Sequence, residues 1–319
     1  MAADGDEAEL RDRAVNCAAG HHFVVQRGVL NLLIDPSQQI KDQLAESARE
    51  RRGDLTDIEK DAYRRNVSRI GMATYNQLIR DNARAALDEV PVRLGRSLDL
   101  GGGSGWLAGE LARRGFEAVS LDIENPLDRA RQITEGAPSR SFELVTDAAS
   151  ETDVAGVDFV VAEMEHLPFA DASFDLVSVS AALHHSDDPV RTLQEAGRAL
   201  KQGGALVVIN EPVKGIFRDA SPILEGRASE AGDHIYSAGA YVGFFRAAGL
   251  KPRLLFPGWV DRRLLERNWD GVIYYRRLRS LMAELWRAPG VRPLVRGPLV
   301  RPGMDVFGLT LIAVATKSE

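Results

Sequence analysis

Residues 97–105 read Ser-Leu-Asp-Leu-Gly-Gly-Gly-Ser-Gly and decide how the rest of the chain is interpreted. The apolar run before the glycines ends at Leu100, and Leu107, Leu111 and Ala112 follow at helical spacing. A strand, a glycine turn and a helix in this order place free backbone N–H groups and the positive end of a helix dipole at the turn. The stretch therefore predicts a ligand site at the end of a strand in an α/β fold.

The chain from residue 96 to residue 256 continues this alternation of strand-like and helix-like segments. We expect strands at 96–100, 117–121, 157–162, 174–180, 204–210, 252–256 and 306–316, and helices near 105–115, 126–135, 188–201 and 237–248. Such alternation is typical of a parallel sheet with helices on both faces. The predicted fold class is therefore α/β, with a Rossmann-like, mostly parallel seven-stranded sheet.

Other segments lie outside the alternation. We expect residues 1–36 to form a small β-rich module, residues 37–92 a helical lid or linker, and residues 93–319 the main domain with substrate-side inserts at 212–236 and 258–304. Helical period in the lid is clearest at residues 56–87, where Tyr63 and Tyr75 are either lid residues or core residues.

Length and composition are those of a globular protein. The 319 residues are 45% hydrophobic and 27% charged, which is enough apolar surface for a sizeable core. No apolar stretch approaches the ~20 residues of a membrane span. The acidic N-terminus lacks the apolar segment of a signal peptide, which favours the cytoplasm. The single cysteine, Cys17, excludes an internal disulfide.

The net charge of −6 is unevenly distributed. Residues 258–303 contain ten arginines and four acidic residues, so this segment carries +6 and the rest of the chain −12. The segment is either a surface for an anionic partner or a solvated helical face, and four prolines at 289, 293, 298 and 302 are expected to break its second half. Its aromatic residues (Trp259, Trp269, Tyr274, Tyr275 and Trp286) suit an anionic or aromatic acceptor, or a homodimer interface.

Two kinds of cofactor fit the glycine turn. Gly103-Ser-Gly105-Trp-Leu-Ala108 matches the dinucleotide pattern G-x-G-x-x-A, and Asp122 lies 19 residues after Gly103. Asp99 argues against a dinucleotide, because its charge would repel a pyrophosphate and attract an ammonium group. A tight structural turn without a ligand is the third interpretation.

The turn also resembles the first motif of the class I S-adenosylmethionine-dependent methyltransferases, D/E-x-G-x-G-x-G. The stretch Asp99-Leu-Gly101-Gly-Gly103-Ser-Gly105 matches this motif in full. The resemblance implies that Asp99, Gly101, Gly103 and Gly105 surround the methionyl part of S-adenosylmethionine.

Three later stretches resemble further motifs of the same family. Asp122 matches the acid that binds the ribose, and Ile123 the apolar residue that packs on adenine; the alternative is that Asp122 caps its loop. Glu163 and Met164 match the pair at the adenine ring; the family often has Asp at the first position, and the 41 residues from Asp122 to Glu163 exceed its usual spacing. Residues 178–189 and 200–206 match the last motifs, and the resemblance assigns Ser180 to the cofactor site.

Two histidines are candidates for a general base. His184 and His185 follow a predicted strand at its C-terminal end, where open α/β sheets bind their ligands. They are either catalytic or an ordinary loop element, with His234 and Tyr236 as second candidates. Asp187 and Asp188 are interpreted as a cap of the helix that begins at Pro189 rather than as metal ligands.

The N-terminal segment resembles a degenerate zinc ribbon of the kind fused to some methyltransferases. A tetrahedral zinc site needs four ligands, and only Cys17, His21 and His22 are available locally. We therefore expect no metal, with the small β-fold retained.

Together these features predict an S-adenosylmethionine-dependent methyltransferase that acts by in-line methyl transfer on a small-molecule acceptor, namely a sugar, lipid-linked or secondary-metabolite hydroxyl. The alternatives are an RNA methyltransferase, a non-catalytic S-adenosylmethionine-binding protein and an NAD-dependent oxidoreductase. The acidic net charge makes nucleic acid an unfavourable partner.

Overall fold

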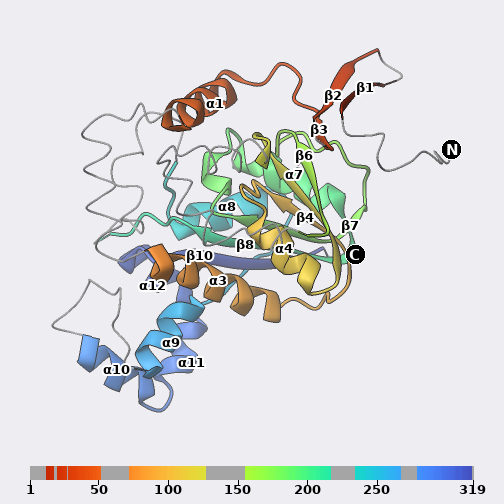
Figure 1. Cartoon of the computed structure of the whole chain (residues 1–319). Helices are drawn as coiled ribbons and strands as arrows, with labels where there is room; N and C mark the ends of the chain where they lie inside the picture. Colours follow the sequence, from red (N-terminus) through yellow and green to blue (C-terminus); the bar gives the residue numbers. More distant parts are fainter. Residues whose placement is uncertain are drawn as a thin grey trace.

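A ten-stranded sheet runs through the centre of the computed structural model, which describes residues 12–17, 20–26, 28–51, 72–126, 155–216, 234–266 and 279–317 (Figure 1). The strand order is β1-β2-β3-β6-β5-β4-β7-β8-β10-β9. The strands are β1 (Asp12–Asn16), β2 (His22–Gln26), β3 (Val29–Asn31), β4 (Gly95–Leu100), β5 (Phe116–Asp122), β6 (Val157–Val161), β7 (Phe174–Ser180), β8 (Leu200–Glu211), β9 (Arg253–Leu254) and β10 (Leu311–Thr316).

The helices of the described residues lie on both faces of this sheet and beyond its two ends (Figure 1). They are α1 (Gln38–Arg51), α3 (Met72–Asp88), α4 (Trp106–Arg113), α7 (Pro189–Ala199), α8 (Ala238–Ala247), α9 (Gly258–Glu266), α10 (Arg279–Arg287), α11 (Val291–Arg296) and α12 (Val300–Phe307). A short 3₁₀ turn, η2 (Leu183–His185), follows β7.

The central strands confirm the predicted α/β class. Strands β6, β5, β4, β7 and β8 are parallel neighbours, and β10 runs antiparallel between β8 and β9. The sheet has ten strands instead of the expected seven because β1–β3 extend it. Strand β3 pairs in parallel with β6, with Leu30 opposite Val160, and the N–H of Leu32 donates to the carbonyl of Val161 at 2.7 Å. The N-terminal strands thus pair an edge whose backbone groups would otherwise be exposed.

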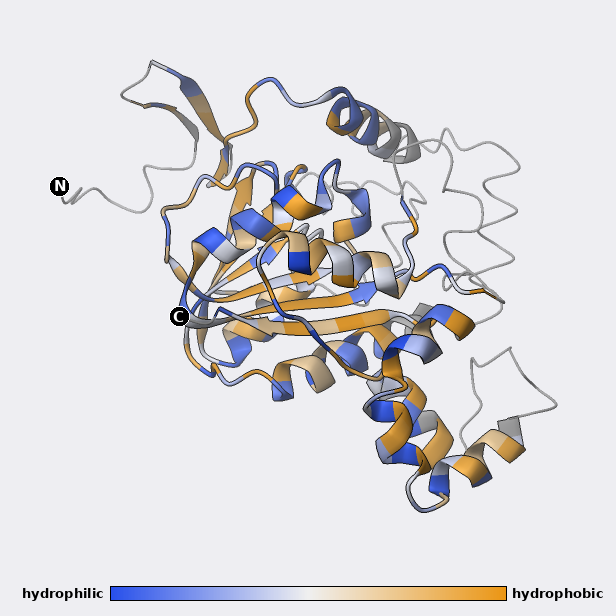
Figure 2. Cartoon of the chain, turned by 180° about the vertical axis from the view of Figure 1, so that it is seen from behind, coloured by the Kyte–Doolittle hydropathy of each residue, from blue (hydrophilic) through white to orange (hydrophobic). Residues whose placement is uncertain are grey.

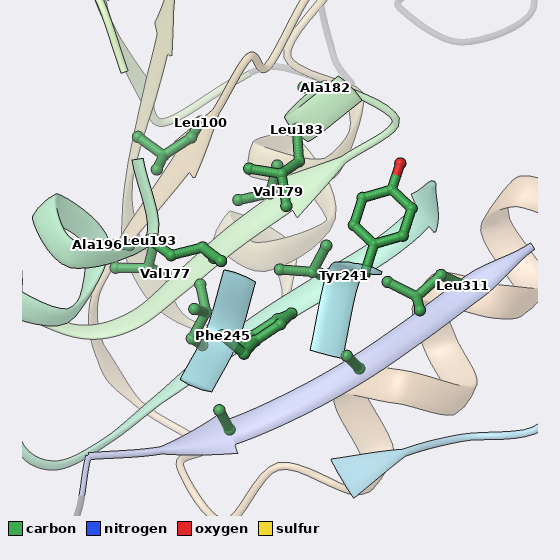
Figure 3. Packing of buried hydrophobic residues seen from close by; sticks show 14 of the residues in the cluster. Leu100, Val177, Val179, Ala182, Leu183, Leu193, Ala196, Tyr241, Phe245 and Leu311 are labelled. Atoms are coloured by element: carbon green, nitrogen blue, oxygen red, sulfur yellow. The ribbon is translucent and has the colours of Figure 1, made fainter. Parts of the chain in front are cut away.

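Strand β8 shows how the two faces of the sheet are filled. Leu206 and Val208 pack in the hydrophobic cluster that contains α7 and α8, whereas Val207 and Ile209 pack in the cluster that contains α3 and α4. Figure 3 shows side chains of α7 and α8 against the first face, namely Leu193, Ala196, Tyr241 and Phe245. Because both faces are buried, the strand reads as a continuous apolar run rather than an alternating one.

Some predicted boundaries were wrong, each for a local reason. Helix α7 ends at Ala199, so β8 begins at Leu200 and not at residue 204. The expected strand 306–316 begins only at Leu311, because its first residues belong to α12, which ends before Gly308 at φ +59°. Pro293 and Pro302 lie in the first turns of α11 and α12, where a missing N–H costs little, so they start helices rather than break them.

Several expectations fall outside the described residues. These are Tyr63, the helix expected at 126–135 beyond its first residue, most of the insert 212–236, and Trp269, Tyr274 and Tyr275. Of Tyr75 the backbone alone is described, within α3. Among the described residues, no helix combines the length and the apolarity needed to cross a membrane.

The start of α7 confirms the predicted cap. The side chain of Asp188 accepts a hydrogen bond from the N–H of Arg191 at 3.0 Å, and Pro189 occupies the first helical position. A carboxylate here satisfies an N–H that has no partner within the helix and faces the positive end of the dipole.

The substitution Asp188→Ala is expected to lower the free energy of unfolding by about 1 kcal/mol, because it removes this cap. Urea unfolding of the variant measures the loss. The neighbouring Asp187→Ala is the control, since its carboxylate accepts an exposed bond from the Ser37 hydroxyl and caps no helix. Equal losses in the two variants would contradict the capping role.

Candidate active site

The residues predicted to form the site meet at one edge of the sheet. Asp99, Asp122, Ser180 and Glu211 lie at or next to the last residues of β4, β5, β7 and β8, and Glu163 follows β6 by two residues. Parallel strands bring their carboxyl ends to the same edge, and β4 lies between β5 and β7, where the strand order reverses. This edge is the usual ligand position of an open α/β sheet.

The glycine turn after β4 is packed too tightly for side chains. A Cβ on Gly101, which has φ +63°, would collide with the Cβ of Ala182, and one on Gly102 would collide with the Ser120 hydroxyl. The turn is tied to β5 by hydrogen bonds from Gly102 N to Leu121 O at 3.1 Å and from Gly103 N to an Asp122 oxygen at 2.8 Å. Backbone atoms therefore line this part of the site.

Helix α4 begins directly after the turn without a side-chain cap. Gly105 occupies the N-cap in the left-handed conformation, with φ 79°, and offers no side chain to cap the helix; the Asp99 carboxylate accepts from the backbone of Ala108 in the first turn. Backbone N–H groups of the first turn thus have no partner from within the helix, as the sequence predicted for the segment that follows Gly105.

Asp99 lies beneath the turn with only 1% of its surface exposed. One oxygen accepts a hydrogen bond from the Ser178 hydroxyl at 2.7 Å. Burial raises the pKa of Asp99 to about 7; the Ser178 bond opposes this rise and the charge of Asp122 adds to it. No ion pair joins Asp99 to a cation of the described residues, so its negative charge is poorly compensated.

Asp122 is held by backbone N–H groups on both sides of its carboxylate. One oxygen accepts from Gly103, and the other accepts from Glu124 at 3.0 Å. Each carboxylate oxygen can accept more than one bond, so the half-buried group retains acceptors for two hydroxyls. Ile123 follows it directly and is also half-buried.

Glu163 and Met164 lie beside the same turn. The N–H of Ala162 donates to Asp122 O at 3.0 Å, which joins the ends of β5 and β6. The Met164 methyl group borders the space above Gly101. Glu163 Oε2 lies 3.1 Å from His166 Nδ1, a partner that the sequence did not suggest. The predicted adenine contact of Glu163 stays a prediction.

Ser180 belongs to a chain of polar side chains that reaches α3. Its hydroxyl accepts a hydrogen bond from Asn210 Nδ2 at 3.1 Å, and Asn210 Oδ1 accepts one from Asn82 Nδ2 at 3.0 Å. Asn210 adopts φ 62° at the end of β8. The chain fixes the orientation of Ser180, whose cofactor contact stays a prediction.

Glu211 is the functional candidate that sequence reasoning missed. Its fully buried carboxylate accepts hydrogen bonds from the backbone N–H groups of three consecutive residues, Ala182, Leu183 and His184, at 2.9 to 3.1 Å. It also contacts the ring Nδ1 of His184 at 2.9 Å. The available signal was an acid at the carboxyl end of an otherwise apolar strand.

These four partners control the charge of Glu211. Burial alone would raise its pKa, but the bond and the charge of the His184 ring, together with the N–H groups of Leu183 and Ala182, bring the pKa below its ordinary value. The carboxylate is therefore ionised. It holds Nδ1 of His184 as the donor, so that the ring in its neutral form has its lone pair on Nε2.

The two histidines occupy different surroundings although their rings lie 4.1 Å apart between centroids. His184 is buried, whereas His185 is half-buried and its carbonyl accepts bonds from Gln39 and Gln43 of α1, each at 3.0 Å. Helix α1 thus contacts η2 directly. The predicted position of both histidines after β7 is confirmed.

The second-choice residues lie close to His184. The N–H of His234 donates to the His184 carbonyl at 3.0 Å. The Tyr236 ring lies edge-on to Tyr241 and Phe244, and burial raises its pKa. His234 and Tyr236 therefore come to the same end of the sheet as the first-choice candidates.

The N-terminal candidate ligands form a smaller group. Cys17 Sγ lies 3.4 Å from His21 Nδ1, while the ring of His22 contacts the Asn16 side chain instead. In the part of the chain that the structure describes, no three His, Cys, Asp or Glu residues are grouped so that they could hold a metal.

Comparison with known proteins finds a family match over the central strands. Residues 98–208 match the family described as a methyltransferase domain. A demethylmenaquinone methyltransferase from Beutenbergia cavernae is 36% identical over 126 residues, which are 39% of this chain and 45% of that protein. A 27-O-demethylrifamycin SV methyltransferase from Amycolatopsis mediterranei is 32% identical over 171 residues, 51% of this chain and 57% of that protein.

A solved structure covers more of the chain at lower identity. It is the complex between the Haloferax volcanii Trm112 methyltransferase activator and a methyltransferase. The match covers 98% of one chain of that complex and 88% of this chain, with 21% identity and a TM-score of 0.48.

The match to relatives is confined to part of their length. The chain spans 45% and 57% of the two relatives above and 20% of a biotin biosynthesis bifunctional protein from Cellvibrio japonicus. The shared part contains the glycine turn, Asp122 at the end of β5 and the turn that carries the two histidines. Residues 98–208 therefore match a methyltransferase domain.

Proposed function

We propose that the whole chain is a methyltransferase that transfers a methyl group from S-adenosylmethionine to a small-molecule acceptor. The observation that carries the proposal is the packed glycine turn above the buried Asp99, at the same sheet edge as the Glu211–His184 pair. The first feature suits the cofactor and the second suits removal of a proton from the acceptor.

The residues around the turn fit S-adenosylmethionine. Gly101 and Gly102 have no side chains, so a ligand can approach the backbone of the turn. The poorly compensated charge of Asp99 favours a cationic group above the turn, and the cofactor has both an ammonium and a sulfonium. Asp122 retains acceptors for the ribose hydroxyls.

Proton removal is the chemistry that the chain itself has to supply. S-adenosylmethionine, when bound, supplies an already activated methyl group. The chain aligns the acceptor for in-line attack and takes up the hydroxyl proton. We assign this proton to Nε2 of His184, because Glu211 holds Nδ1 as a donor and would stabilise the protonated ring. Glu211 is a positioning residue, and His185 is the alternative base.

The acceptor is proposed as a sugar, lipid-linked or secondary-metabolite hydroxyl. The names of relatives include methyltransferases of demethylmenaquinone and of a demethylated rifamycin, which are small organic molecules. An RNA acceptor is less favoured, because the chain has a net charge of −6.

Calorimetry with S-adenosylhomocysteine and with NAD tests the cofactor. We expect the first to bind and the second not to, because an anionic pyrophosphate would lie near Asp99 and Asp122. Failure of S-adenosylhomocysteine to bind would overturn the proposed function.

Gly101→Ala is expected to lower S-adenosylhomocysteine affinity about tenfold or more, because the new Cβ meets Ala182 and the residue keeps a left-handed backbone at a cost of about 1–2 kcal/mol. Gly243→Ala is the matched control, since an added Cβ in that part of α8 meets no atom within 4 Å. The same calorimetric titration measures both variants, and an unchanged affinity in Gly101→Ala would refute the role of the turn.

Asp99→Asn is expected to stabilise the fold above pH 7 while weakening S-adenosylhomocysteine binding. The pKa of Asp99 is about 7 in the folded chain and 3.8 ordinarily. Between pH 3.8 and about pH 7 the unfolded chain releases a proton that the folded chain retains. The free energy of unfolding therefore falls as pH rises, by about 1.4 kcal/mol per pH unit and by about 4 kcal/mol over the whole range. Asparagine keeps an acceptor for Ser178 and cannot ionise.

Urea unfolding of the original chain and the variant at about pH 4 and about pH 8 measures this difference. The free energy of unfolding of the variant should exceed that of the original chain most at the higher pH. A constant difference between the two chains at both pH values would show that Asp99 does not titrate as stated.

Glu211→Gln and His184→Gln are expected to lower kcat by about 10²- to 10⁴-fold with little change in S-adenosylhomocysteine affinity, because each disturbs the base. Methyl transfer from tritiated S-adenosylmethionine to naphthohydroquinone and to simple phenols supplies the assay. In Glu211→Gln the pH profile of kcat should also shift, since the His184 ring loses its carboxylate partner. If His185→Gln alone abolishes turnover, the base is His185.

A further inference from the structure

Helices α9–α12 form a surface that the proposed methyl transfer does not use. They follow β9, and α9, α10 and α11 project away from the sheet at its lower end in Figure 1. Figure 2 shows hydrophobic residues on these projecting helices together with hydrophilic ones. We call the outward side of α9–α12 the helical surface.

Helix α10 is apolar on two opposite sides. Ala283 and Trp286 are buried, and the Trp286 ring lies 4.9 Å from that of Phe256. Leu281 and Leu285, one helical turn apart and therefore on one side, are 56% and 51% exposed. A helix that only packed on its own domain would have a polar outer side.

Further exposed leucines lie on the neighbouring helices. Leu265 lies near α10, because its carbonyl accepts a hydrogen bond from the Arg287 side chain. The N–H of Leu299 donates a hydrogen bond to the carbonyl of Leu294 at 3.1 Å. Of the ten large apolar side chains that the described residues expose, five are these leucines of α9–α12. Such a concentration marks a surface that contacts another apolar phase or molecule.

The charge of the segment identifies the kind of partner. Helices α9–α12 contain seven arginines and four acidic residues, a net charge of +3, whereas the whole chain has a net charge of −6. Asp261 lies 2.6 Å from Arg292 and 3.7 Å from Arg296, and Asp305 lies 3.7 Å from Arg301. Arg262 pairs with Asp81 of α3 at 3.0 Å. Leucines on a positively charged helical surface are the pattern of proteins that lie on an anionic membrane.

We propose that the helical surface docks on an anionic lipid bilayer, with the exposed leucines entering the interface and the arginines facing lipid headgroups. A second copy of the chain would bring two positive surfaces together, which costs free energy. A nucleic acid would match the charge but not the leucines. The docking is peripheral, because no helix of the described residues could cross the bilayer.

This inference goes beyond the proposed function and does not depend on it. Its test measures binding to vesicles alone, so methyl transfer could fail while docking succeeds, or the reverse.

The test is sedimentation of the full chain with vesicles of phosphatidylcholine and of an equal mixture of phosphatidylcholine and phosphatidylglycerol. We expect binding to the mixture only, weakened by salt. The double variant Leu281→Gln and Leu285→Gln should lose about tenfold or more in affinity, because two side chains no longer bury apolar surface. Arg296→Gln should lose less affinity for the vesicles than the double variant does.

Leu94→Gln is the matched control. Leu94 is 67% exposed but lies just before β4, outside the helical surface. The Leu94→Gln variant should therefore bind the vesicles as the original chain does. Far-ultraviolet circular dichroism verifies that each variant is folded.

Three results would overturn the proposal: no binding to the anionic vesicles, equal binding to phosphatidylcholine alone, or full binding by the double variant. If the double variant instead abolishes a dimer detected by sedimentation without vesicles, the helical surface is an interface between copies of the chain.

Discussion

The carboxylate of Glu211 holds together the part of the molecule on which the proposed chemistry depends. It reaches from the end of β8 to three successive N–H groups after β7 and to the His184 ring. A turn with no regular strand or helix partner would otherwise leave buried N–H groups without acceptors. One side chain therefore fixes the backbone of η2, the tautomer of His184 and, through the His184 carbonyl, the backbone N–H of His234.

Asp99 and Glu211 show that burial alone does not determine the charge of a carboxylate. Both have almost no exposed surface. Burial raises the pKa of Asp99, which has one side-chain donor, whereas the ring and N–H donors around Glu211 outweigh burial and lower its pKa. The first group is thus suited to respond to a bound cation, and the second to keep its neighbours in place.

The local features of the site could be predicted from the sequence, whereas those created by distant contacts could not. The glycine turn and the Asp188–Pro189 helix start have signals within a few residues, and both lie where expected. The pairing of β3 with β6, the bond between Glu163 and His166, and the role of Glu211 depend on packing. A single acid at the end of β8 has the same local appearance whether it faces solvent or a buried turn.

The pairing of Leu30 with Val160 also constrains how the chain assembles. Strands β1 to β3 leave the ribosome first, but the strand that accepts them is made only after β4 and β5. Contacts between residues so far apart form slowly, because a long loop must close first. The N-terminal strands therefore remain an unpaired edge until β6 has been made, and until then their backbone groups are open to pairing with another nascent chain.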